Sequence, residues 1–233
     1  MLKPRLLPSI LRNPSWADLS LAIQTTELIG LESGSLVAEL VFGSIDGIFS
    51  VLGIIAAAAA AALSPEQIFT TGVGGAAAGA LSVFAATYLS QTTEKKTRIL
   101  NAWENSKNLM ARKARSENGQ RRVPTKKDHA KFHNLLAKVH RRALVSGLVT
   151  SSTSSLASLA LLLPLVLLSQ AYSVSASILI GIFLLSFMGA FRGITLKQSA
   201  AKSAIKMVVL GVIIIVASRL LGSYVQSIFG PTH

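Results

Sequence analysis

The feature that most constrains this chain is a set of long segments without a charged side chain. Between Arg142 and Arg192 lie 49 such residues, and between Glu66 and Glu94 lie 27. About 20 apolar residues in a helix cross the hydrocarbon core of a bilayer. Only 14% of the residues are charged and 51% are hydrophobic, whereas soluble domains are about a quarter charged. The sequence therefore predicts an all-α, polytopic membrane protein and argues against a water-soluble globule.

Five transmembrane helices are expected, with a basic, helical cytoplasmic insert between the second and the third. Ser64 is expected to cap the second helix, with Pro65 at its first position. The polar residues 169–173 are expected to separate the third helix from the fourth. The expected spans are 35–62, 67–91, 143–169, 174–193 and 203–227. The resulting regions are an N-terminal cytoplasmic or interfacial segment (1–34), helices one and two (35–91), the insert (92–142) and helices three to five (143–233).

Positive charge is concentrated in the insert. Residues 92–142 hold 15 of the 23 Lys and Arg residues and only four acidic residues. Basic segments are retained in the cytoplasm. Two expected spans separate the N-terminus from the insert, so the N-terminus is expected on the same cytoplasmic side. The membrane is expected to be a prokaryotic cell membrane or a eukaryotic endomembrane. Each basic residue near a bilayer favours anionic lipid by about 1 kcal/mol. Anionic lipid is thus the first expected partner and an acidic protein the alternative, through Arg112, Lys113, Arg115, Arg121, Arg122, Lys126, Lys127, Arg141 and Arg142.

Nucleic acid is not expected as a partner of the insert. Binding to single strands needs aromatic side chains on which bases stack, and the insert offers only Trp103 and Phe132. The chain also has no cysteine and no recognisable catalytic or phosphate-binding motif. An enzyme is therefore not expected.

The first expected helix carries Glu39 and Asp46, the only acidic residues placed within a span. They are two helical turns apart and so lie on one face. A carboxylate in hydrocarbon is costly, and it normally faces a cavity or a partner along an ion or proton pathway. Asp46, the deeper residue, is interpreted as functional. For Glu39, a pathway role and a position among the lipid headgroups are equal alternatives.

Small residues accompany these carboxylates. Gly43 and Gly47 form a G-x-x-x-G pattern around Asp46, and the second helix repeats the pattern at Gly75 and Gly79. Small residues let helices approach closely and leave room beside a carboxylate. The four glycines are therefore candidates for a pathway or for packing, and packing alone is the commoner reason for the pattern.

Hydroxyl side chains are frequent in the third expected helix, with eight Ser and Thr residues between positions 146 and 158. Such groups bond their own helix, bond a neighbouring helix or line a wet cavity. The first two roles, which are structural, are favoured over the third.

Three stretches of sequence resemble the vacuolar iron transporter family. They are VFGSIDGIFSVLG (41–53), GGAAAGALSVFAATYLSQTTEKK (74–96) and LLSFMGAFRGITLKQSAAKSAIKMVVLGVIIIVASRLLG (184–222). The resemblance implies a five-helix homodimer that exchanges Fe²⁺ or Mn²⁺ for protons through a pathway between the subunits. The metal would be the transported ion, with no tightly bound cofactor. The first-span aspartate of the family maps to Asp46, and an acidic residue is common at the position of Glu39.

Two departures from the family pattern support a different hypothesis. Gly75 and Val83 occupy positions at which the family's second span has a glutamate and a methionine on the metal path. In addition, the insert is basic, whereas relatives with a cytoplasmic metal-binding region have glutamates there, and cations repel further cations. The alternative function is a structural or accessory subunit that has kept the fold, lost transport and assembles with other membrane subunits.

The insert also contains His129, His133 and His140. In a helix these residues lie on roughly one face, and the spacing of the first two suits a metal clip. Lysines surround them, and a solvated basic helix is therefore the favoured interpretation over a metal site.

Overall fold

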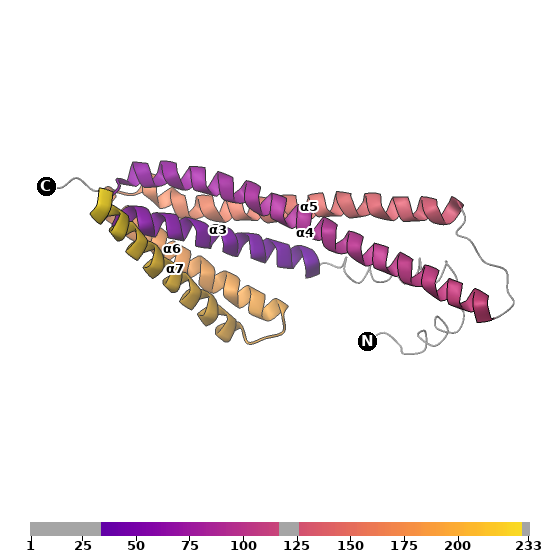
Figure 1. The fold of residues 1–233 in the computed structure, drawn as a ribbon. Helices are drawn as coiled ribbons and strands as arrows, with labels where there is room; N and C mark the ends of the chain where they lie inside the picture. Colours follow the sequence, from indigo (N-terminus) through magenta and orange to yellow (C-terminus); the bar gives the residue numbers. More distant parts are fainter. Residues whose placement is uncertain (1–33, 117–125, 230–233) are drawn as a thin grey trace. The chain divides into compact units, whose positions relative to one another are not determined.

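Five long helices make up the part of the chain that the structure describes. This computed structural model describes residues 34–116 and 126–229, with side chains for residues 36–101, 104 and 136–229. The helices are α3 (Gly34–Ala60), α4 (Pro65–Ser116), α5 (Lys126–Leu167), α6 (Gln170–Thr195) and α7 (Ala200–Phe229) (Figure 1). Each contains a stretch long and apolar enough to cross a membrane. The all-α fold with five membrane-spanning helices is therefore confirmed.

The turn between α3 and α4 forms as its sequence predicts. The backbone N–H of Ser64 donates to Oε1 of Gln67 over 2.9 Å, and the N–H of Gln67 donates to Oγ of Ser64 over 3.4 Å. This reciprocal capping box satisfies two free N–H groups at the start of a helix. Pro65 is the first residue of α4, where its missing N–H costs nothing. Both predictions for this turn are confirmed.

The break between α5 and α6 is shorter than expected. Residues 169–173 were expected to separate the two helices, but α6 already begins at Gln170. The N–H groups of Tyr172 and Ser173 both donate to the carbonyl oxygen of Ser169. Polar residues are well tolerated in a first turn because their side chains can bond the backbone, and Oγ of Ser173 does so with the carbonyl of Gln170.

The chain divides into two compact units. One comprises Met1–Ser35 and Tyr88–Val145, and the other comprises Leu36–Thr87 and Ser146–His233. In the first unit, the described side chains of Ile99, Val139 and Ala143 are buried. The second unit holds part of each of the five helices, including all of α6 and α7.

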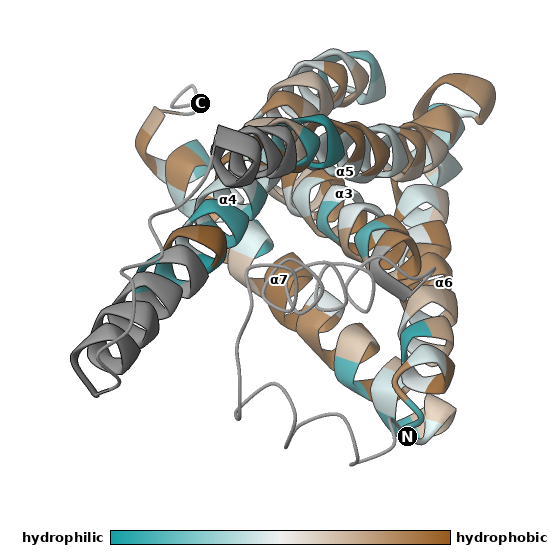
Figure 2. Cartoon of the chain, turned by 90° about the vertical axis from the view of Figure 1, so that its right-hand side faces the viewer, coloured by the Kyte–Doolittle hydropathy of each residue, from teal (hydrophilic) through white to brown (hydrophobic). Residues whose placement is uncertain are grey.

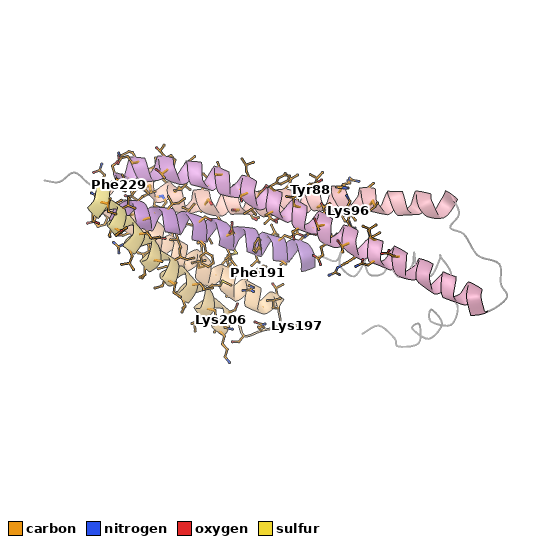
Figure 3. All side chains as sticks on the ribbon, viewed as in Figure 1. Tyr88, Lys96, Phe191, Lys197, Lys206 and Phe229 are labelled. Atoms are coloured by element: carbon orange, nitrogen blue, oxygen red, sulfur yellow. The ribbon has the colours of Figure 1, made fainter. Side chains whose placement is uncertain are left out.

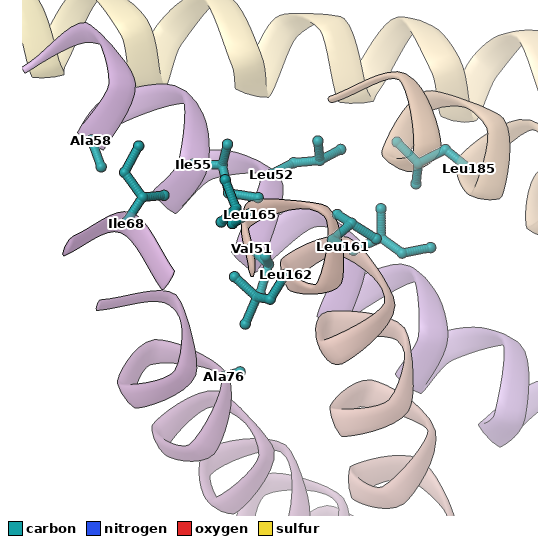
Figure 4. Packing of buried hydrophobic residues seen from close by; sticks show 11 residues of the cluster. Val51, Leu52, Ile55, Ala58, Ile68, Ala76, Leu161, Leu162, Leu165 and Leu185 are labelled. Atoms are coloured by element: carbon teal, nitrogen blue, oxygen red, sulfur yellow. The ribbon is translucent and has the colours of Figure 1, made fainter. Parts of the chain in front are cut away.

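The core of the second unit is built around α3. Its buried side chains interlock with those of α4, α5 and α6 (Figure 4). The buried side chains of this cluster are Ile48, Val51, Leu52, Ile55 and Ala58 of α3, Ile68 and Ala76 of α4, Leu161, Leu162 and Leu165 of α5, and Leu185 of α6. This cluster fixes α3 among the other spans.

Large apolar side chains cover the outside of the second unit. Leu81 of α4, Leu167 of α5, Phe183 of α6 and Phe229 of α7 are each at least 70% exposed. Figure 2 shows long hydrophobic stretches along α6 and α7. Exposed apolar surface on this scale is costly in water, and backbone groups paired within helices are what hydrocarbon requires. The surface therefore fits contact with lipid.

Candidate functional site

The candidate site lies on one face of α3. Glu39 and Asp46 are both partly buried, and seven helical residues separate them by about 10 Å along the axis. Among the residues that the structure describes, none hydrogen-bonds or ion-pairs with the Asp46 carboxylate. A carboxylate within a membrane span needs a partner, whether a proton, a cation or water. The described residues supply no such partner to Asp46.

The glycines beside Asp46 hold α3 against α5. A Cβ atom at Gly43 would collide with the backbone carbonyl of Thr150, and one at Gly47 with that of Ser154. Oγ of Ser158 donates a 3.3 Å hydrogen bond to the carbonyl oxygen of Gly47. The G-x-x-x-G pattern of α3 therefore has a packing role, and it sets the position of the helix that carries Asp46.

The hydroxyl groups of α5 mostly bond their own helix. Oγ1 of Thr150 donates to the carbonyl of Ser146 over 2.8 Å, and Oγ of Ser155 donates to that of Ser151 over 2.9 Å. Thr153 bonds the carbonyls of residues 149 and 150 in the same way. These hydrogen bonds favour the structural interpretation of the hydroxyl-rich segment over a wet cavity.

Helix α7 covers the carboxylate face further along α3. Gly53 lies seven residues after Asp46 and so shares its face. A Cβ at Gly53 would lie 3.2 Å from Oγ of Ser218 on α7, and Gly222 packs directly against Ala57. The face of α3 is thus closed by a neighbouring helix beyond Asp46. This contact could not be predicted from the sequence, because α3 and α7 are far apart in the chain.

The glycines of α4 differ in their surroundings. A Cβ at Gly75 would collide with Cδ1 of Ile54 on α3, whereas one at Gly79 would meet no atom within 4 Å. Val83 is partly buried. Neither Gly75 nor Val83 offers a metal-binding side chain, and Ile54 occupies the space in which a longer side chain at position 75 would begin.

The structure gives His140 a partner that the sequence did not predict. Its Nδ1 lies 3.1 Å from the hydroxyl of Tyr88 on α4, within hydrogen-bonding distance, and the ring centroids are 6.3 Å apart. The two residues are 52 positions apart in the sequence. His129 and His133 lie in α5, but their side chains are outside the described part of the chain.

The basic residues predicted to contact lipid or a partner are described only in part. Arg141 is exposed and Arg142 is partly buried. Arg121 and Arg122 lie outside the described residues. Five more lie in helical segments whose side chains are not described, namely Arg112, Lys113 and Arg115 in α4 and Lys126 and Lys127 in α5.

Within the described residues, no group of three or more His, Cys, Asp or Glu side chains is placed to hold a metal ion. The carboxylates of α3 therefore do not form a three-ligand site with the other acidic or histidine side chains that the structure describes. A metal at Asp46 would need further ligands from outside this set of described side chains.

These features define an integral membrane protein with five spans, the first of which carries two partly buried carboxylates. The sequence matches the model of the VIT family over residues 37–118, which includes α3 and α4. The match covers 82 of the 233 residues, and it includes the first-span motif that resembles the vacuolar iron transporter family. No curated protein matches the chain. Members of the VIT family are transporters.

Proposed function

We propose that this protein exchanges a divalent metal ion, Fe²⁺ or Mn²⁺, for protons across its membrane. Asp46 would be the central metal ligand and proton acceptor, and Glu39 would assist it one stage along the pathway. The observation that carries the proposal is the Asp46 carboxylate, which lies within the α3 span without a partner among the described residues.

Competition at one carboxylate provides the coupling. A low-dielectric environment favours the neutral form of a carboxyl group, and a bound divalent cation favours the ionised form. Metal binding therefore releases a proton, and protonation releases the metal. A site that alternately faces the two sides of the membrane then exchanges one ion for the other.

A homodimer completes the site in this proposal. The described residues contain no three-ligand cluster, so a second copy of the chain would supply a second set of α3 carboxylates. Divalent iron and manganese accept oxygen ligands, and two pairs of carboxylates would provide them. The metal is the transported substrate, and no tightly bound cofactor is part of the mechanism.

We also place the N-terminus in the cytoplasm. The insert and the α6–α7 link each follow an even number of spans and both carry basic residues, whereas the α3–α4 and α5–α6 links carry none. Basic segments are retained on the cytoplasmic side. Anionic lipid on that side is the proposed partner of the insert.

The experiment is metal uptake into proteoliposomes that contain the full-length protein. Uptake of Fe²⁺ should depend on a pH gradient and should be lost in Asp46→Asn. Glu66→Gln is the matched control, because Glu66 is exposed at the start of α4, and this variant should keep uptake. Equal uptake by wild type and Asp46→Asn would refute the assignment.

The contact between Ile54 and Gly75 favours a second candidate function, an accessory subunit without transport activity. Ile54 fills the space beside Gly75, at a position where the resemblance leads us to expect a metal ligand. Purification in mild detergent distinguishes the two functions. A stoichiometric complex with other membrane subunits, together with no uptake, supports the accessory role, whereas a homodimer with uptake excludes it.

A further inference from the structure

The link between α6 and α7 forms a second concentration of positive charge, separate from the insert. Four basic side chains, those of Arg192, Lys197, Lys202 and Lys206, are all exposed. We call residues 192–206 the α6–α7 tip. The sequence contains no acidic residue after Asp128, and among the described residues none of the four side chains has a hydrogen-bond or ion-pair partner. The charge of the tip is therefore not offset by neighbouring acidic groups of its own segment.

The tip is held in one conformation by close packing. A Cβ at Gly193 would lie 2.9 Å from Cα of Ala200, so the two helices touch at the turn. The N–H of Gln198 donates to the carbonyl of Gly193 over 2.8 Å. Lys197 has a φ of 54°, a left-handed conformation that glycine adopts more easily. Lys197 therefore places a positive charge at the turn, although its left-handed backbone conformation is unfavourable for a residue with a side chain.

Apolar side chains alternate with these cations. Phe191 is 42% exposed, Ile194 67% and Leu196 52%. In the sequence, Phe191 adjoins Arg192, Leu196 adjoins Lys197, and Ile194 lies between these pairs. Figure 3 shows Lys197 in the link, with Lys206 further along α7 and directed away from α6. Apolar side chains beside cations at the end of a span are typical of the layer where hydrocarbon meets headgroups.

All four cations can reach that layer. Lys206 lies six residues into α7, about 9 Å along the helix from its start. Its long side chain can extend back toward the polar surface while its methylene groups remain in hydrocarbon. The four charges can thus converge on one headgroup region.

We propose that the α6–α7 tip binds the phosphate headgroup of an anionic phospholipid in the leaflet that it contacts. Clustered basic residues at the ends of spans attract such headgroups. An acidic soluble protein fits this surface less well. It would have to bury the exposed apolar side chains of Phe191, Ile194 and Leu196, which lipid hydrocarbon can contact directly. This inference does not depend on the proposed transport function.

Native mass spectrometry of the full-length protein tests the proposal, with phosphatidylglycerol as the probe and phosphatidylcholine as the neutral reference. Replacing Arg192, Lys197, Lys202 and Lys206 together by Gln should lower the affinity for phosphatidylglycerol at least tenfold and leave that for phosphatidylcholine unchanged. The control keeps all four charges with Arg192→Lys, Lys197→Arg, Lys202→Arg and Lys206→Arg, and it should keep the affinity of the wild type. An unchanged affinity in the tip variant, or an equal loss in the control, would overturn the proposal.

A single substitution separates lipid binding from folding. Lys197→Gly removes one charge and relieves the left-handed backbone, so it should weaken phosphatidylglycerol binding about fivefold without lowering the melting temperature. Ala62→Gly is the matched control, because Ala62 also has a positive φ, of 59°, in a link without basic residues. It should leave lipid binding unchanged. Lipid affinity that Lys197→Gly does not alter would contradict the proposal.

Native mass spectrometry also shows whether the tip binds the phosphate group of a lipid or a free phosphate ion. Inorganic phosphate at 10 mM lacks acyl chains, so we expect it not to displace phosphatidylglycerol from the tip. Displacement would show that the tip is a site for free anions and would overturn the lipid assignment. Co-purification of an acidic protein that depends on the four cations, without preferential binding of phosphatidylglycerol, would also overturn it.

Discussion

Ser158 on α5 donates a hydrogen bond of 3.3 Å to the carbonyl oxygen of Gly47 on α3. Gly47 directly follows Asp46, so this bond fixes the backbone beside the candidate metal ligand. The contact requires that Gly47 has no side chain, because a Cβ there would collide with the backbone of Ser154. The position of Asp46 thus depends on close packing between α3 and α5.

Gly47→Ala should destabilise the protein. The added methyl group meets backbone atoms of Ser154, which cannot move without displacing α5, and overpacking of this kind costs about 1–3 kcal/mol. Gly74→Ala is the control, since a Cβ at Gly74 meets no atom within 4 Å and alanine favours a helix by up to about 1 kcal/mol. Thermal unfolding in detergent should show a lower melting temperature for Gly47→Ala only. A melting temperature of Gly47→Ala equal to that of the wild type would show that the α3–α5 contact is looser than described.

The pH dependence of transport should reveal competition at Asp46. If protons and metal share this carboxylate, acidification on the side from which metal is loaded should raise the apparent KM for Fe²⁺. The increase should approach about tenfold for each pH unit below the pKa of the loading site. Initial uptake rates at several external pH values, with the internal pH held constant, measure it. A KM for Fe²⁺ that is the same at all these external pH values would exclude a site shared by protons and metal.

The space beside Gly75 can be tested by restoring an acidic side chain. Gly75→Glu alone should lower the melting temperature slightly, because its Cβ meets Cδ1 at the flexible end of the Ile54 side chain, which has to shift. Combined with Ile54→Ala, it should lower the melting temperature by less than the two single losses together, since the double variant provides the room that the glutamate needs. Binding of Mn²⁺, measured by calorimetry, should be tighter in the double variant than in Ile54→Ala alone. Equal binding would show that position 75 does not face the metal path.

The five spans could be predicted from the sequence because their signal is local. A charge-free run of apolar residues and the cap formed by Ser64 and Gln67 depend only on neighbouring residues. The exception was the segment 169–173, whose polar side chains suggested a break although they fit the first turn of α6.

The surroundings of the candidate residues could be predicted only in part. The sequence singled out Asp46 and the glycines beside it, but not α5 as the helix on which those glycines pack. It also did not reveal that Ile54 fills the space beside Gly75. Such contacts join residues far apart in the chain and depend on how side chains of several helices fit together.

The contact between Tyr88 and His140 should stabilise the first unit locally. The tyrosine hydroxyl lies 3.1 Å from Nδ1 of His140, and the pair is partly buried. Tyr88→Phe keeps the ring but removes the hydroxyl, and loss of one such hydrogen bond costs about 0.5–1.5 kcal/mol. Hydrogen exchange should therefore become faster in α4 and α5 near these residues, with no change in the α6–α7 segment. Tyr224→Phe is the control, because Tyr224 is 65% exposed on α7 and its hydroxyl has no partner among the described residues. Exchange near His140 that is as slow in Tyr88→Phe as in the wild type would show that the hydrogen bond contributes nothing to local stability.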